Sequence, residues 1–251
     1  MQGDATLVAA SVAGELASVV AFSFGIAEAR QILRRHPLPD DAPVAERIRR
    51  YRHEGRLGVF AGRPTLGLNR LQEAVDLAEQ AGLPLLEAHG RMALGAALSA
   101  GTLGQEAEHH LRRAIALTSA HALPEQHVRA TLRLGQHLLR LGLRTDAGQL
   151  LDDALGAAVR AGLTRLEEQI VGTLGYLLIG ERRFHTALTH LDRAVELCRE
   201  HGGKRGLYVA LCNRGLALAL AGRPGDARVD LTDALGASGG GAGWYGALGT
   251  A

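Results

Sequence analysis

The sequence contains only two cysteines, Cys198 and Cys212. Two are too few for a disulfide framework, and they lack the paired spacing of a zinc site. We therefore expect a reducing compartment, with the cytoplasm as the location.

Long hydrophobic runs are also missing. The apolar stretch 16–27 is shorter than the roughly 20 residues that a bilayer span needs. The residues before it include Asp4 and Glu15, where a signal peptide would be basic. The sequence therefore predicts neither targeting nor contact with a membrane.

Aromatic residues are scarce as well, and neither sign of charge is in large excess. Phe, Trp and Tyr make up 4% of the chain, so the core must be built from Leu, Ala, Val and Ile, which suits packed helices better than a β-sandwich. The net charge of +2 is far smaller than the positive charge that proteins use to bind nucleic acids. We expect an all-α protein without direct nucleic-acid contact.

What the chain does have is an internal repeat. Five columns of small or aliphatic residues recur with a spacing of 40 residues over four units. They are Gly95, Gly135, Gly175 and Gly215; Leu98, Leu138, Leu178 and Leu218; Ala107, Ala147, Ala187 and Ala227; Leu111, Leu151, Leu191 and Leu231; and Ala114, Ala154, Ala194 and Ala234. Leu precedes the glycine in three of the four units and Arg214 in the last. Chance does not keep five columns in phase, so the repeat determines the predicted architecture.

Each unit is predicted to be a pair of helices. The Ala, Leu and Ala columns lie at i, i+4 and i+7, which is one stripe of a helix. The glycine falls inside the preceding helix, where it costs about 1 kcal/mol relative to alanine, so we expect it to permit a close approach of the partner helix. First helices are expected near 43–61, 84–100, 124–141, 164–180 and 204–221, and second helices near 65–81, 103–121, 145–161, 183–201 and 225–237.

The pattern divides the chain into three parts. Residues 1–41 are predicted to form a divergent helix pair and a loop, and residues 42–237 form five helix pairs. Residues 238–251 are a Gly-rich tail in which Trp244 and Tyr245 begin an incomplete helix. An unpaired apolar face there would allow self-association through the C-terminal end.

The order Leu-Gly, Leu, Ala, Leu, Ala resembles the tetratricopeptide signature over nearly the whole chain. The period departs from the 34 residues that are usual in that family, and the proline that often ends its second helix is missing. The resemblance implies a right-handed α-solenoid of antiparallel helix pairs. Longer units of this kind are similar to the sensor regions of MalT-type bacterial transcription regulators, although no ATPase or DNA-binding motif accompanies them in this sequence.

Residues that could carry chemistry are few, and we expect no catalytic residue, metal or cofactor. Glu106 and His110 are one turn apart and could bridge a metal, but such i, i+4 pairs are common on exposed polar helix faces without any metal. Cys198 and Cys212 are interpreted as a reduced, packed pair in preference to a redox couple. No nucleophile motif such as Gly-x-Ser-x-Gly occurs.

A basic segment near residues 47–56 is the sharpest charge feature. Glu46 with Arg50 and Arg50 with Glu54 are i, i+4 pairs, which favours a salt-bridged helix. The alternative is a phosphate-binding patch, as in a nucleic-acid-associated regulator fragment.

The family resemblance also implies a ligand-binding groove lined by first helices. The positions that usually face it carry these residues: His89, Arg129, Arg133, Gln136, Gln169, Thr173, Tyr176 and Asn213. Arg52, on an earlier first helix, is expected to add a third positive charge to the groove. Arg129 and Arg133 share one helix face and resemble part of the carboxylate clamp of chaperone-binding members, but Ala93 stands where the clamp has an amide. Alternatively, both arginines pair with carboxylates such as Glu125 or Glu168.

We therefore expect a non-catalytic repeat module, from the regulatory, sensor or scaffold region of a bacterial signalling or transcription regulator. Its expected partner is a protein, a peptide or a small anionic effector, bound along the groove.

Overall fold

In the computed structural model, the described residues, 2–23, 25–101 and 104–237, form twelve helices and no strand. The helices of the first half are α1 (Gln2–Ser23), α2 (Ile26–Arg35), α3 (Val44–Phe60), α4 (Pro64–Gln80), α5 (Pro84–Ser99) and α6 (Gly104–Ala120). Those of the second half are α7 (Pro124–Arg140), α8 (Arg144–Arg160), α9 (Thr164–Gly180), α10 (Phe184–His201), α11 (Lys204–Leu220) and α12 (Pro224–Ala237). The predicted all-α class is confirmed.

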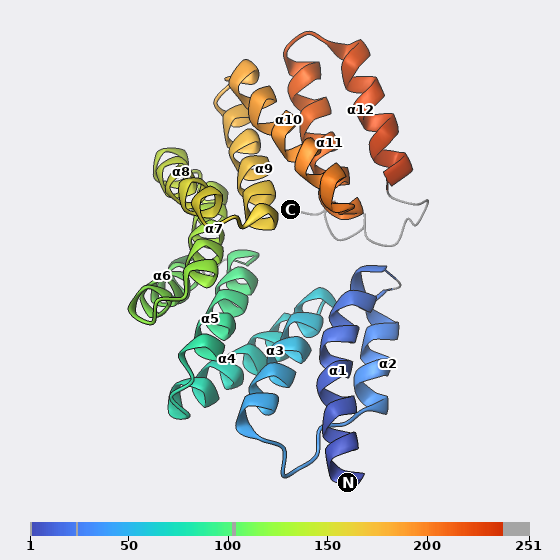
Figure 1. Ribbon diagram of the computed structural model, residues 1–251, viewed down its shortest axis with the longest axis vertical. Helices are drawn as coiled ribbons and strands as arrows, with labels where there is room; N and C mark the ends of the chain where they lie inside the picture. The colour runs from blue at the N-terminus through green and yellow to red at the C-terminus, as the bar shows by residue number, and fades with distance from the viewer. Residues whose placement is uncertain (1, 24, 102–103, 238–251) are drawn as a thin grey trace. The chain divides into compact units, whose positions relative to one another are not determined.

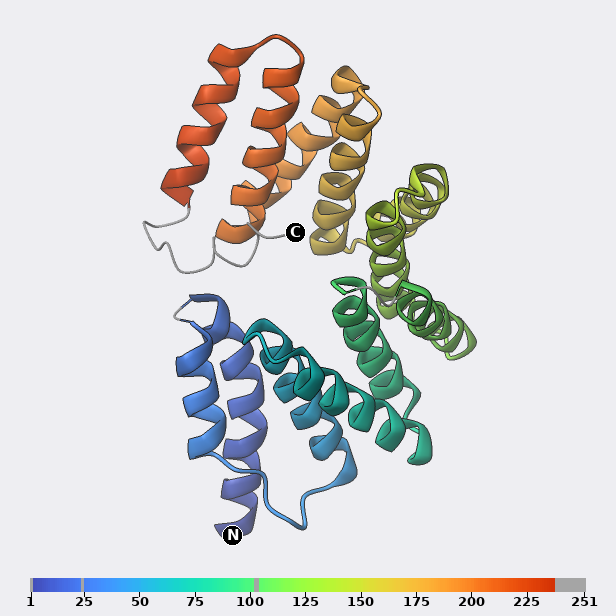
Figure 2. The ribbon, with the colours of Figure 1, turned by 180° about the vertical axis from the view of Figure 1, so that it is seen from behind.

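The helices form consecutive pairs, each with an odd-numbered first helix and an even-numbered second helix (Figure 1). Two compact units contain them, one of residues up to 126 and one that begins at residue 127, early in α7. In the second unit α10 packs on both α9 and α11, and α11 packs on α12 (Figure 2). Among the described residues, no helix is both long enough and apolar enough to cross a bilayer.

Short turns end the helices where the sequence places its helix breakers. Proline is the first residue of α4, α5, α7 and α12, a position where its missing N–H group is not needed. Gly142 and Gly202 follow second-unit helices with φ values of 78° and 67°, a left-handed conformation that glycine adopts without a Cβ clash. The connections are therefore too short to let the paired helices separate.

The repeated glycine is the point of closest approach within a pair. A Cβ built on Gly175 would lie 2.5 Å from Cγ of Leu191, and one built on Gly135 would lie 2.9 Å from Cγ of Leu151. Gly55 makes the same approach to Leu71 in the α3–α4 pair, at 2.6 Å. The expected role of the glycine column is thus confirmed.

The leucine that meets this glycine also joins one pair to the next. Leu71 and Val75 of α4 pack against Leu94 and Leu98 of α5. In the second unit, Val195 and Cys198 of α10 pack in the same way with residues of α11. Within each unit the core therefore continues from a second helix to the following first helix, as a repeat array requires.

The N-terminal residues form the additional helix pair α1–α2, whose Ala17 packs with Ala29, Leu33 and Leu57. The division of the chain into residues 1–41, 42–237 and 238–251 stays a prediction. The tail with Trp244 and Tyr245 lies outside the described residues.

Candidate binding site

First helices are neighbours in both units. Helix α9 packs beside α11, and α3 packs beside α1 and α5. A side-chain hydrogen bond between Gln136 and Thr173 links α7 to α9. Side chains of successive first helices therefore reach one another, which is what a binding face across several repeats needs.

A line of polar side chains runs from α7 to α9. Arg133 donates from Nη1 to Oε1 of Gln136 at 3.0 Å, and Gln136 donates from Nε2 to Oγ1 of Thr173 at 3.4 Å. Thr173 in turn donates to the backbone carbonyl of Gln169 at 2.7 Å. Four of the nine expected groove residues are thus connected by hydrogen bonds.

The remaining expected residues of the second unit lie on the first helices α7, α9 and α11. Arg129 is half-buried on α7, one turn before Arg133. The side chain of Tyr176 is exposed on α9, one turn after Thr173, and Asn213 is half-buried on α11. Their helical spacing, together with the polar line, describes a surface with two guanidinium groups, three amides, a hydroxyl and a phenol.

Arg52 and His89 lie in the other unit, on α3 and α5. The Arg52 guanidinium is directed towards α1, with Nη2 3.8 Å from Oε1 of Glu15 and 3.4 Å from Nε2 of His53. Burial lowers the pKa of Arg52, and Glu15 offsets part of that shift. The Arg52 charge is therefore already used to hold α3 against α1.

One of the two carboxylates expected to compete for the arginines, Glu168, lies against Cys198 and close to Gly206. Burial, together with a hydrogen bond that the Cys198 thiol donates to the Glu168 carboxylate, raises the pKa of the thiol to about 12, so the thiol stays protonated at neutral pH. Both cysteines are free thiols. A protonated, buried Cys198 is a poor nucleophile, which fits the interpretation of a reduced, packed pair.

A hollow of about 320 Å³ between α10, α11 and α12 is another place where an anion could meet an arginine. Arg214 lines it, but its guanidinium donates two hydrogen bonds of 2.7 Å to Asp230 and one of 2.9 Å to Asp192. Because two carboxylates neutralise this arginine, the hollow is a poor anion site.

The basic segment of α3 makes the carboxylate contacts that its spacing predicts. Arg49 bonds Glu46, and Arg50 bonds Glu54 at 2.7 Å as well as the carbonyl of Leu33 at 2.5 Å. These contacts reduce the positive charge available to a phosphate backbone and favour the salt-bridged interpretation.

The histidines of α6 lie close together as expected from sequence. The His109 and His110 rings meet edge to face with centroids 5.6 Å apart. Burial, with Arg91 nearby, lowers the pKa of His110 to about 4. Over the described ranges no three His, Cys, Asp or Glu residues come near enough to hold a metal ion.

One buried polar network was not predicted from the sequence. On α3, Nδ1 of His53 lies 2.7 Å from Oγ of Ser18, and Nε2 donates to Oε1 of Glu15 at 3.2 Å. Both partners belong to α1. Burial lowers the pKa of His53 to about 4, with the positive charge of Arg52 as the next cause. The available signal was the presence of Glu15 and Ser18, three residues apart, within the mostly apolar stretch 5–21.

Searches against known proteins identify the fold and leave the family unassigned. No protein-family model and no curated protein matches the chain. Among solved structures, a Rap protein complexed with competence and sporulation factor matches with a TM-score of 0.74 and 14% identity over 88% of this chain. A second match is NprR in complex with its cognate peptide NprX, with a TM-score of 0.68 and 12% identity over 92% of this chain. A third is a signal transduction ATPase with a tetratricopeptide repeat sensor from Pyrococcus horikoshii, with a TM-score of 0.65 and 10% identity over 97% of this chain.

The chain has the tetratricopeptide-like repeat fold. It spans 61% of the Rap chain, 67% of the NprR chain and 38% of the ATPase chain. The structural matches therefore establish a shared tetratricopeptide-like architecture. Because the sequence identities are this low, the ligand of this chain has to be argued from its own residues.

Proposed function

We propose that this chain is a non-catalytic regulatory module that binds a peptide or effector through an anionic group on the first helices α7, α9 and α11. The anionic group is a terminal carboxylate or a phosphate. The observation that carries the proposal is the polar line Arg133, Gln136 and Thr173, which joins two successive first helices.

The chemistry of this face suits a peptide with a free carboxylate. Arg129 and Arg133 supply planar, permanently charged donors that match a carboxylate or phosphate. Gln136, Gln169 and Thr173 can exchange hydrogen bonds with a peptide backbone, and the exposed ring of Tyr176 supplies apolar contact area. Such a mixture binds an extended peptide better than it binds a flat protein surface.

The comparisons support this class of ligand by analogy. NprR binds its cognate peptide, and the Pyrococcus ATPase uses its tetratricopeptide repeats as a sensor. By the same analogy, we place the chain in a bacterial signalling or transcription regulator similar to the MalT type. Among the described residues, Arg49, Arg50 and Arg52 already contact carboxylates, which argues against a nucleic-acid role for α3.

The test uses an array of peptides with free carboxyl termini, the same peptides as C-terminal amides, and phosphopeptides. Replacing Arg129 and Arg133 together by Ala should weaken the best binder at least about a hundredfold, because each charge-assisted contact is worth about 1.5 to 3 kcal/mol. Amidation of the peptide should cause a similar loss.

The matched control removes the same charge elsewhere in the second unit. Arg140 and Arg160 are exposed at the ends of α7 and α8, so their double Ala variant should bind like the wild type. Equal affinity of the Arg129 and Arg133 variant and the wild type would refute the binding face. Tight, salt-dependent binding of DNA in a filter assay would instead support the nucleic-acid alternative.

A further inference from the structure

The solvent-accessible side chains of the first helices change in character from α7 to α11. The proposed binding face uses three repeat columns, and their spacing of four and then three residues puts them on one stripe of each helix. The stripe consists of Arg129, Arg133 and Gln136 on α7; Gln169, Thr173 and Tyr176 on α9; and Val209, Asn213 and Leu216 on α11. Its charged end is therefore on α7 and its apolar end is on α11.

Two aliphatic side chains at the α11 end are open to solvent. Val209 is 40% exposed and Leu216 is 44% exposed, and Tyr176, in the column of Leu216 on the neighbouring helix α9, is 56% exposed. On α3 and α5 the same columns hold no large aliphatic residue; they hold Arg49, His53 and Arg56, and His89, Ala93 and Ala96. A residue needed for packing between repeats would recur with the period. The packing of the array therefore does not explain Val209 and Leu216.

The apolar end is continuous with the polar line. The hydrogen bond from Gln136 to Thr173 joins α7 to α9, and α9 packs beside α11. All residues of the stripe belong to the second compact unit. Packed helices have axes about 8 to 10 Å apart, so roughly 16 to 20 Å separate α7 from α11. An extended peptide advances about 3.3 to 3.6 Å per residue, so it covers that distance in about five residues.

We infer that the ligand of this face is a short extended peptide with its terminal carboxylate at the two α7 arginines and a bulky apolar side chain on Val209 and Leu216, about five residues before the C-terminus. The inference rests on the proposed function and adds a specificity determinant to it. The arginines hold the carboxylate by charge-assisted hydrogen bonds, and the apolar side chain removes its own surface and that of α11 from water. Asn213, between the two aliphatic residues, can both donate to and accept from the peptide backbone. The peptide residues between the two anchors are free to vary.

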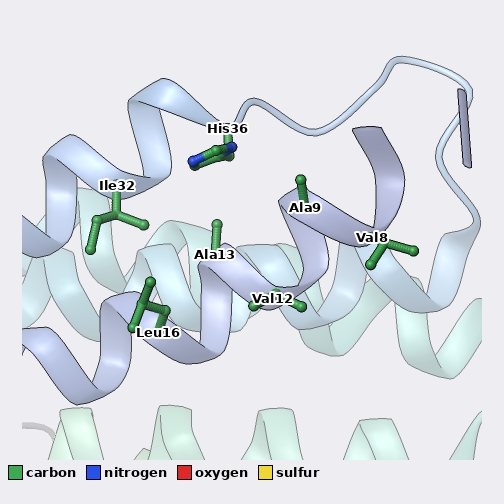
Figure 3. Close-up of a pocket in the computed structure, with 7 residues that line it drawn as sticks. All are labelled: Val8, Ala9, Val12, Ala13, Leu16, Ile32 and His36. Atoms are coloured by element: carbon green, nitrogen blue, oxygen red, sulfur yellow. The ribbon is translucent and has the colours of Figure 1, made fainter. Parts of the chain in front are cut away.

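A second apolar surface in the chain provides the matched control. In the first unit, Val12 and Leu16 of α1 line a hollow of about 590 Å³ together with Ile32 and His36 of α2 (Figure 3). Val12 is 58% exposed and Leu16 is 47% exposed, so the hollow offers the same two residue types to an apolar side chain. The seven residues drawn in Figure 3 include no arginine, and they lie outside the unit that contains the stripe. We therefore expect the hollow to contribute nothing to carboxylate-dependent binding.

A positional library of decapeptides tests the inference. In each pool one position is fixed as Leu or Ser and the other positions are mixtures, and every pool is made with a free C-terminal carboxylate and as the C-terminal amide. The immobilised full-length chain should retain Leu pools about tenfold better than Ser pools at one position, about five residues before the C-terminus, which is the ratio expected for a half-buried leucine side chain. Amidation should lower the retention of every pool.

Variants at each apolar surface assign the Leu preference to its site. The double variant Val209→Ser and Leu216→Ser should lose the preference, and the control, Val12→Ser with Leu16→Ser, should keep it. In further pools fixed as Glu, Leu216→Arg should make Glu the preferred residue at the same position, because the new guanidinium pairs with a carboxylate. Unfolding of the variant cannot produce that exchange of preference.

The outcomes separate this inference from the proposed function. Retention that does not depend on the free carboxylate would refute the proposed function, and this inference with it. Retention that depends on the carboxylate but favours Leu at no position, or a Leu preference that survives in the α11 double variant, would overturn this inference alone. So would loss of the preference in the control, which would place the apolar side chain in the α1–α2 hollow. A wild type that self-associates in sedimentation, with an α11 double variant that does not, would assign the apolar end to a second copy and also overturn it.

Discussion

His53 illustrates how one buried residue makes the stability of this protein depend on pH. It lies between α1 and α3 with hydrogen bonds to Ser18 and Glu15, and burial lowers its pKa from 6.5 to about 4. The unfolded chain takes up a proton at this imidazole below pH 6.5, and the folded chain resists doing so until about pH 4. The folded state is therefore favoured at neutral pH, and this advantage is lost as the pH falls through that window.

We expect the free energy of unfolding of the wild type to fall by about 2 kcal/mol through His53 between pH 7 and pH 5. His53→Gln removes the titrating group, so urea unfolding of this variant should lose less stability over the same interval. His201→Gln, at an exposed site near the end of α10, is the control and should keep the wild-type pH dependence. A His53→Gln variant with the full wild-type dependence would exclude His53 as the cause.

The contacts of single residues are where the predictions from the sequence and the structure differ most. The repeat comparison places Arg133 and Thr173 at equivalent positions of first helices, and the structure connects them through Gln136 by hydrogen bonds. Arg52 was expected to add a positive charge to the groove, but the sequence gives no sign that Glu15 lies beside Arg52. The contact joins residues from α1 and α3, and no repeat spacing relates them because α1 departs from the pattern.

At the scale of the helix, two glycines of α9 have opposite surroundings. A Cβ on Gly175 would lie 2.5 Å from Cγ of Leu191 on α10, whereas a Cβ on Gly172 would meet no atom within 4 Å. Alanine is favoured over glycine inside a helix by about 1 kcal/mol, but overpacking a close helix contact costs about 1 to 3 kcal/mol.

The two substitutions should therefore shift the melting temperature in opposite directions. Gly172→Ala should raise it, because the new methyl group meets open space and only the helix propensity changes. Gly175→Ala should lower it, because α10 has to move away or Leu191 has to leave its rotamer. If thermal denaturation showed equal gains for both, the close approach at the repeated glycine would be refuted.

At the scale of the whole molecule, the division into two compact units predicts that a core substitution destabilises mainly the helices around it. In a repeat array each pair contacts only its neighbours, so stability is close to a sum of local terms. Leu71 in the first unit and Leu191 in the second are both fully buried, and replacing either by Ala should cost about 2 to 5 kcal/mol.

Hydrogen exchange should show where that loss occurs. Leu71→Ala should reduce amide protection in α3, α4 and α5 and leave α9, α10 and α11 near the wild type, and Leu191→Ala should do the reverse. Uniform loss of protection in both variants would mean that the twelve helices unfold as one cooperative body.

The sequence alone determined the period, the helix pairs, the turns and the close approach at the glycine column. These features are local or recur every 40 residues, so helical periodicity and turn chemistry are sufficient to find them. Only the tertiary structure decided that Arg52 is held by Glu15, that His53 is buried, and that Leu231 and Val12 remain exposed. The physical reason is that burial depends on which helix lies next to a face. Leu191 and Leu231 occupy the same column, but α10 is followed by α11, which packs on it, whereas α12 is the last helix of the described residues.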